Sequence, residues 1–94
     1  MAPYETVEEY TRKEEGYVEH VRIRQTDSEH YPSGWDYTLH YGTTDGHTLL
    51  RYDNAHERHK GHERHTPDGV EDIEFPGMTE LLVRFQREVD ELPP

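Results

Sequence analysis

Residues 35–53 have the sequence WDYTLHYGTTDGHTLLRYD, and this stretch decides the fold class. From position 35 to position 41, large apolar side chains alternate with polar ones, which is the period-two pattern of a strand with one buried face. Residues 42–46 are rich in Gly, Thr and Asp and favour a tight turn, and residues 47–53 supply a partner strand. The stretch therefore predicts an antiparallel β-hairpin.

The segment before the hairpin predicts one strand and one helix. Residues 17–26 alternate in the same way, so we expect a half-buried strand there. Thr6 is followed three residues later by Glu9, which is the spacing of a helix-capping box. The sequence therefore predicts a short helix over Thr6–Glu14, ended by Gly16.

The segment after the hairpin predicts a loop, a strand and a second helix. Residues 55–69 contain four His, two Arg, two Gly and one Pro without an apolar period, which predicts a loop. Val70–Phe75 has the composition of a short strand. From Met78 to Leu92, apolar residues recur at helical spacing, which predicts a C-terminal helix ended by Pro93.

Together these elements predict a single α+β domain over residues 1–94. About four antiparallel strands form a sheet, and the C-terminal helix packs on one face. A chain of 94 residues is too short for two separate cores. Leu, Ile, Val and Phe account for only 16 residues, so the core is thin and aromatic, and we expect a homodimer or a stabilising partner.

The composition restricts the class of protein. Asp and Glu number 21 against 10 Lys and Arg, which gives a formal net charge of −11 at pH 7. The acidic residues are spread along the chain, as in halophilic proteins adapted to a cytoplasm of high salt. No apolar stretch approaches the length of a membrane span, and the first 15 residues lack the apolar core of a signal peptide, so we expect a cytoplasmic protein. The absence of Cys excludes disulfides, iron-sulfur clusters and thiol catalysis.

The tetrapeptide Arg51-Tyr52-Asp53-Asn54 closes the second hairpin strand and leads into the His-rich segment. Period two places Arg51 and Asp53 on one face and Tyr52 on the other, so a cation and an anion emerge together at a strand end. His40 lies on the polar face of the preceding strand. Whether it faces Arg51 depends on the hairpin register, which the sequence does not define. A surface ion pair before a turn is the simplest interpretation, and the position at a strand end favours a functional role.

Residues 56–65 contain the tetrapeptide His-Glu-Arg-His twice, and this repeat allows three interpretations. The imidazoles of His56, His59, His62 and His65 are suitable zinc ligands. Without a metal, His is the side chain best suited to acid–base catalysis near neutral pH, and Arg stabilises negative charge on a phosphate. The third interpretation is an exposed loop without a catalytic task.

Over residues 17–92, the chain resembles the TumE-type toxins of prokaryotic toxin–antitoxin pairs. The resemblance depends on the aromatic strand that ends near His40, on Arg51-Tyr52-Asp53-Asn54, and on the His cluster that follows at once. It implies a toxin that acts on RNA and that has a cognate antitoxin, often a helix-turn-helix DNA-binding protein. It also implies that His56, His62 and His65 are the functional histidines.

We therefore predict a toxin of a type II pair that acts as a metal-independent endoribonuclease and needs no cofactor. In this hypothesis Arg51 binds the scissile phosphate and Asp53 orients a histidine. His56 or His62 is the general base, and His65 is the general acid. Further substrate contacts are predicted from His40, Tyr52, Asn54, Arg58 and Arg64.

The alternative function is a non-catalytic module. Such a module would bind Zn through the four histidines of residues 56–65, or would bind another protein. A tightly bound metal and a gain of stability on metal addition would distinguish it from the toxin hypothesis.

Overall fold

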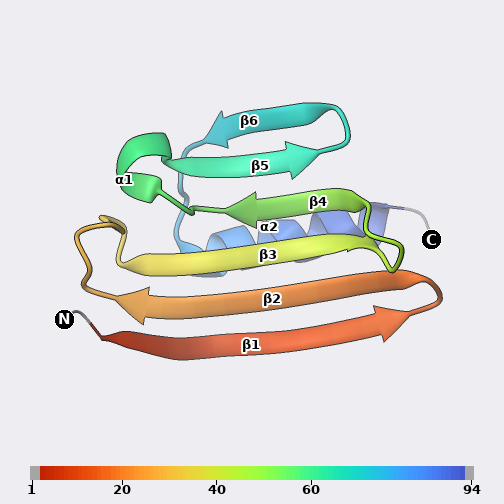
Figure 1. The fold of residues 1–94 in the computed structure, drawn as a ribbon, viewed down its shortest axis with the longest axis horizontal. Helices are drawn as coiled ribbons and strands as arrows, with labels where there is room; N and C mark the ends of the chain where they lie inside the picture. The colour runs from red at the N-terminus through yellow and green to blue at the C-terminus, as the bar shows by residue number, and fades with distance from the viewer. Residues whose placement is uncertain (1–2, 93–94) are drawn as a thin grey trace.

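The computed structural model describes residues 3–92, in which an antiparallel sheet lies against one long helix (Figure 1). The described strands are β1 (Tyr4–Glu14), β2 (Tyr17–Thr26), β3 (Trp35–Thr43), β4 (Thr48–Asp53), β5 (His62–Thr66) and β6 (Gly69–Ile73). The described helices are α1 (Glu57–Lys60) and α2 (Met78–Glu91). The strands follow one another across the sheet in chain order, and each is antiparallel to its neighbours.

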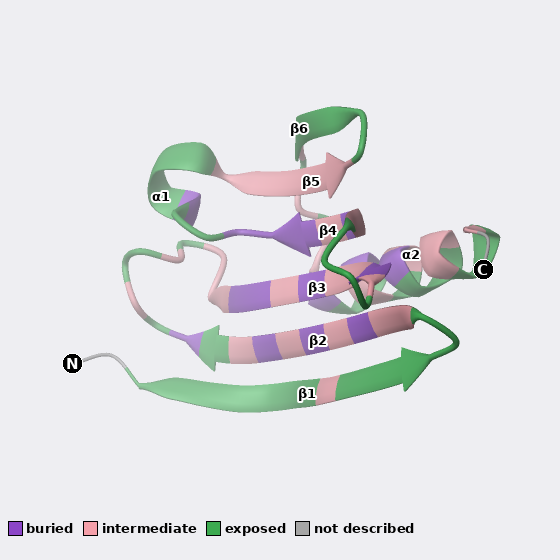
Figure 2. Ribbon diagram, turned by 45° about the vertical axis from the view of Figure 1, so that its right-hand side comes forward, coloured by how far each residue is buried: buried purple, intermediate pink, exposed green. Residues whose placement is uncertain are grey.

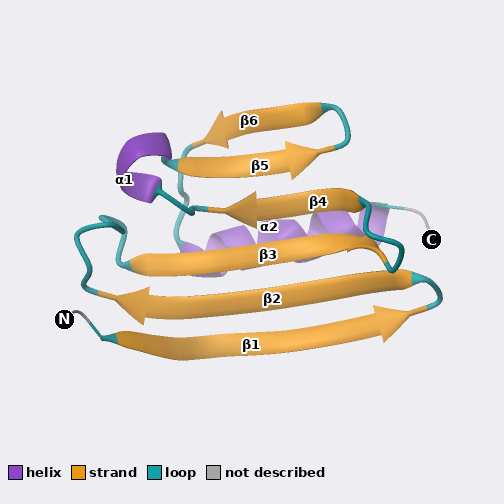
Figure 3. Ribbon diagram, in the orientation of Figure 1, coloured by secondary structure: helices purple, strands orange, loops and turns teal. Residues whose placement is uncertain are grey.

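The predicted α+β architecture is confirmed in its main elements (Figure 3). β3 and β4 form the predicted hairpin, and β2 has the predicted bounds. α2 begins at Met78 and packs on one face of the sheet. In the part of the chain that the structure describes, no helix is long and apolar enough to cross a membrane.

The predicted N-terminal helix over Thr6–Glu14 is wrong, because these residues belong to β1. This strand pairs with β2 along its length, apart from one irregularity between Thr6 and Glu8. The connection is the two-residue turn Glu15–Gly16, in which both residues have positive φ angles of 48° and 87°. Such turns match the twist of a hairpin. The backbone groups of these residues therefore form hydrogen bonds with β2. These bonds replace the hydrogen bonds of the helix that the local capping pattern favours.

The predicted loop over residues 55–69 is also corrected. It contains α1, all of β5 and the first residue of β6. β5 has no apolar residue, so it lacks the one-sided pattern by which strands are recognised in a sequence. It nevertheless pairs with β4 on one side and β6 on the other, which gives the described sheet six strands instead of about four.

The core lies between α2 and the sheet face that turns toward it (Figure 2). Its buried side chains are Val21, Ile23, Tyr37, Leu39, Leu50, Tyr52, Met78, Leu81 and Phe85. The rings of Tyr52 and Phe85 meet edge to face, with centroids 6.5 Å apart. No described element packs on the opposite face of the sheet, which we call the open face (Figure 1).

Candidate active site

The open face carries a row of basic side chains across the sheet. Successive register partners are His20 on β2, His40 on β3, Arg51 on β4 and His65 on β5. We call these four residues the His/Arg row. Their neighbours in sequence point the other way, because side chains alternate along a strand. Adjacent strands lie about 4.8 Å apart, so His40 and His65 flank Arg51 with about 10 Å between their backbones.

Arg51 is the cation at the centre of this row. Its Nε lies 2.8 Å from Oδ2 of Asp53, and its Nη2 lies 3.4 Å from Nε2 of His65. The Arg51 side chain is 38 % exposed, whereas that of Asp53 is only 10 % exposed. The predicted Arg51–Asp53 pair therefore forms, and part of the guanidinium faces solvent.

His65 is surrounded by carboxylates. Its Nε2 lies 3.5 Å from Oδ2 of Asp53 and 3.5 Å from Oε1 of Glu63. Asp53 and Glu63 are register partners, as are Arg51 and His65. These four residues form a compact group on two neighbouring strands, which we call the β4–β5 cluster. Glu63 is not among the residues predicted from the sequence, although it lies two positions before His65 and shares its face once β5 is recognised as a strand.

His40 lies on the other side of Arg51. Its Nε2 is 3.1 Å from Oγ1 of Thr48. A Cβ atom at Gly42 would lie 3.1 Å from Cε1 of the His40 ring, so the missing side chain at Gly42 leaves room for the imidazole. Burial, followed by the influence of Arg51 and His20, lowers the pKa of His40 below its ordinary value. The lowered pKa favours the neutral form of the His40 imidazole, which can accept a proton.

The family of this chain was determined by comparison with family models. The model described as Toxin TumE matches residues 2–93, which is nearly the whole chain. The chain belongs to the TumE toxin family. Comparison with curated proteins and with solved structures gives no match. The resemblance predicted from the Arg51–Asn54 tetrapeptide and the His cluster is thus confirmed, and with it a toxin-like function.

Three residues predicted for the toxin site or for the alternative zinc site lie away from the His/Arg row. His56, Arg58 and His59 are exposed residues at or within α1. His56 precedes the helix with a φ angle of 64°, and Arg58 pairs with Glu29 at 3.2 Å. His56 is therefore not part of the group around Arg51, the residue that is predicted to bind the phosphate.

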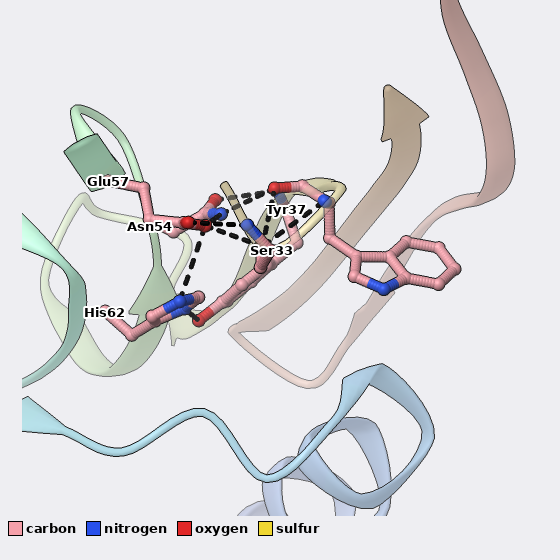
Figure 4. A network of polar contacts seen from close by, with 6 residues as sticks. Ser33, Tyr37, Asn54, Glu57 and His62 are labelled. Carbon is pink, nitrogen blue, oxygen red and sulfur yellow. Dashed lines mark hydrogen bonds and ion pairs between the residues drawn. The ribbon is translucent and has the colours of Figure 1, made fainter. Parts of the chain in front are cut away.

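His62 lies on the helix side of the sheet, opposite to His65. Its Nδ1 is 2.7 Å from the Tyr37 hydroxyl (Figure 4). Its ring also stacks on Phe75, with centroids 4.5 Å apart. Burial lowers the pKa of His62, although the carboxylate of Glu57 opposes this effect. Positions 62 and 65 differ by an odd number, so a strand places them on opposite faces. His62 therefore lies on the opposite face of the sheet from Arg51. The histidine that lies beside Arg51, in addition to His65, is His40.

Two residues that are predicted to contact the substrate, Tyr52 and Arg64, pack between the sheet and α2 instead. Tyr52 is fully buried, and its hydroxyl donates a hydrogen bond to Glu88. Arg64 reaches the same carboxylate, with Nη2 2.7 Å from Glu88 Oε2. Both side chains join β4 and β5 to α2, so they stabilise the sheet on which the site lies. They do not point toward the open face.

Asn54 organises the end of the same strand (Figure 4). Its Oδ1 accepts a hydrogen bond from the backbone N–H of Tyr37 at 3.0 Å. Its Nδ2 donates to the Trp35 carbonyl at 2.6 Å and to Glu57 Oε1 at 2.8 Å. Glu57 in turn accepts hydrogen bonds from the backbone and the hydroxyl of Ser33. Asn54, which is 0 % exposed, therefore ties the end of β4 to β3 and α1.

The four histidines considered as zinc ligands do not converge. His56 and His59 are exposed at α1, and His62 and His65 lie on opposite faces of the sheet. Among residues 3–92, the group that does converge is Asp53, Glu63 and His65, whose ligand atoms all lie within 4.8 Å of one another.

Proposed function

We propose that this TumE-family chain is the toxin of a type II pair and that it cleaves RNA without a metal, with the His/Arg row as its active centre. The observation that carries the proposal is Arg51 with His40 and His65 as its register partners on either side. This arrangement offers one cation for a phosphate and one imidazole for each of two proton transfers.

The proposed reaction uses the ribose 2′-hydroxyl as nucleophile. His40, whose pKa burial and Arg51 lower, takes the proton from the 2′-hydroxyl as its oxygen attacks phosphorus. The bond from phosphorus to the 5′-oxygen breaks, and His65 donates a proton to that leaving oxygen. The products are a 2′,3′-cyclic phosphate and a 5′-hydroxyl. Since DNA lacks the 2′-hydroxyl, it is not a substrate.

Arg51 and the carboxylates have supporting roles in this scheme. The exposed part of the Arg51 guanidinium stabilises the charge that develops on the phosphate oxygens. Asp53 and Glu63, each 3.5 Å from Nε2 of His65, orient the imidazole. The assignment of Arg51, Asp53 and His65 follows the sequence hypothesis, while His40 replaces His56 or His62 as the base.

The cellular setting is part of the same proposal. The toxin acts on RNA in the cytoplasm, and a cognate antitoxin, a helix-turn-helix protein, holds it inactive. With a formal net charge of −11, the whole chain repels RNA at low salt. A salt-rich cytoplasm shortens the Debye length to about 3 Å at 1 M, so only the local charges of the His/Arg row act on a phosphate.

The cleavage test uses tag-free protein and labelled RNA in molar KCl, with and without a chelator. We expect discrete cleavage that survives the chelator and that ends in a cyclic phosphate. His40→Gln and His65→Gln each lower the rate by about 10²-fold or more, because each removes one proton transfer. His59→Gln, at an exposed position of α1, is the matched control and retains the native rate.

A different experimental result would contradict each part of the proposal. Loss of cleavage with the chelator would exclude the metal-independent mechanism. Native rates in His40→Gln and His65→Gln would remove the His/Arg row from catalysis. Folded native protein that cleaves no RNA in any condition would exclude the ribonuclease.

The titration of His40 provides a prediction that does not depend on cleavage. We expect its pKa to lie below 6.5 in the native protein and to rise in Arg51→Met, because the guanidinium charge destabilises the imidazolium next to it. NMR titration of the His40 ring measures both values, and Arg87→Met on the outer side of α2 is the control. An unchanged or lower pKa in Arg51→Met would show that Arg51 exerts no charge effect on His40.

A further inference from the structure

We propose that Asp53, Glu63 and His65 form a binding site for a divalent transition-metal ion such as Zn²⁺. The site would have three protein ligands and one open coordination position. It differs from the His-only zinc site considered from the sequence, since two of its ligands are carboxylates and His65 is its one histidine.

The separations of the donor atoms suit such an ion. Nε2 of His65 lies 3.5 Å from one oxygen of Asp53 and 3.5 Å from one oxygen of Glu63. A tetrahedral Zn²⁺ with bonds of about 2.0–2.2 Å requires donor atoms about 3.4 Å apart. All three atoms lie within 4.8 Å of one another, so a small movement of the two carboxylates completes the triangle. One imidazole with two carboxylates is a donor set that zinc accepts.

The backbone holds these ligands in place. Asp53 and Glu63 are register partners on neighbouring strands, and His65 lies two positions after Glu63 on the same face. The three side chains are 10–21 % exposed, so they are partly shielded from water but remain accessible from the open face. A site on paired strands loses little conformational freedom when the metal binds.

The charges around the group also favour a cation. Two carboxylates converge on one imidazole nitrogen, and Arg51 contacts two of the three donor groups, with Nη2 3.4 Å from Nε2 of His65 and Nε 2.8 Å from Asp53. This buried Nε forms no hydrogen bond within the described residues, so the contact is an ion pair without directed bonding. The Arg51 side chain is 38 % exposed, so it is not enclosed by the fold. A metal ion therefore competes with Arg51 for Asp53.

Bound metal would also affect the proposed reaction. It would occupy His65 and Asp53 and turn Arg51 away, so Zn²⁺ would inhibit RNA cleavage; this consequence rests on the proposed function. The binding site itself does not, because metal binding is measured without RNA.

The test is a titration of the full, tag-free chain with Zn²⁺ by calorimetry and with Co²⁺ by visible absorption. We expect one equivalent to bind with a micromolar dissociation constant, and Co²⁺ to show the strong visible bands of a tetrahedral site. Asp53→Asn and Glu63→Gln each weaken binding by more than about 100-fold, since each removes one ligand. Circular dichroism verifies that each variant is folded, and Glu63→Gln, at the less buried carboxylate, remains informative if Asp53→Asn unfolds.

Two further variants distinguish this site from the exposed histidines. Arg51→Met removes the competing cation and is expected to bind Zn²⁺ about fivefold more tightly. The double variant His56→Gln/His59→Gln is expected to bind like the native protein. Absence of saturable binding, binding lost only in the double variant, or weaker binding in Arg51→Met would each overturn the proposal.

Discussion

The Arg51→Ala variant is expected to lose growth inhibition while it retains the native fold. Arg51 is the central cation of the His/Arg row, and its neighbours His40 and His65 cannot supply a permanent positive charge. Removal of one group that stabilises developing negative charge costs about 10²- to 10³-fold in rate. The measurements are growth after induced expression without antitoxin and cleavage of labelled RNA by purified protein.

Two variants make the Arg51 result specific. Arg87→Ala removes an exposed arginine from α2 and is expected to remain toxic. Arg51→Lys keeps a charge but loses the planar fork that matches a phosphate, so we expect an activity between those of Arg51→Ala and the native protein. Full toxicity of Arg51→Ala, with folded protein at native abundance, would remove Arg51 from the mechanism.

The Asn54→Ala variant is expected to lose about 3–5 kcal/mol of stability, because three buried hydrogen bonds disappear together. The change leaves the Tyr37 N–H and the Trp35 carbonyl without their side-chain partner and removes one of the bonds to Glu57. Small domains have only about 5–15 kcal/mol of stability in total, so much of it would be lost. Urea unfolding in high salt, followed by circular dichroism, measures the change.

The control for Asn54 is His59→Ala on exposed α1, for which we expect a change within about 0.5 kcal/mol. If Asn54→Ala unfolded at the native urea concentration, the Asn54 network would not stabilise the fold. The two predictions separate the roles within one tetrapeptide. In the proposed reaction Arg51 binds the phosphate, whereas Asn54 holds the strand end on which Arg51 lies.

The predicted N-terminal helix is wrong because of a non-local partner. The capping-box spacing at Thr6 and Glu9 is a genuine local preference for a helix, yet pairing with β2 overrides it. β5 was missed because both of its faces are polar. His65 and Glu63 belong to the β4–β5 cluster, while His62 and Arg64 pair with groups beneath the helix. A strand that buries no aliphatic side chain has no hydrophobic period to detect.

The histidines illustrate the same limit at the level of the site. The sequence predicts that Arg51, Asp53 and His65 belong to one site, and the structure brings them together. The sequence predicts His56 or His62 as the base and His40 as a substrate contact, because whether His40 faces Arg51 depends on strand register. A shift of one residue in β3 would turn His40 into the core and move the predicted base away from Arg51.

The sequence by itself determined the elements with a one-sided apolar pattern: the hairpin over residues 35–53, the strand over residues 17–26 and the C-terminal helix. It also determined that Arg51 and Asp53 share a face, because alternation along a strand is a local property. Only the tertiary structure decided that His40, Arg51 and His65 are register partners and that Glu63 joins them. Register is set by pairing between segments and by core burial on the opposite face, and neither is encoded within a single strand.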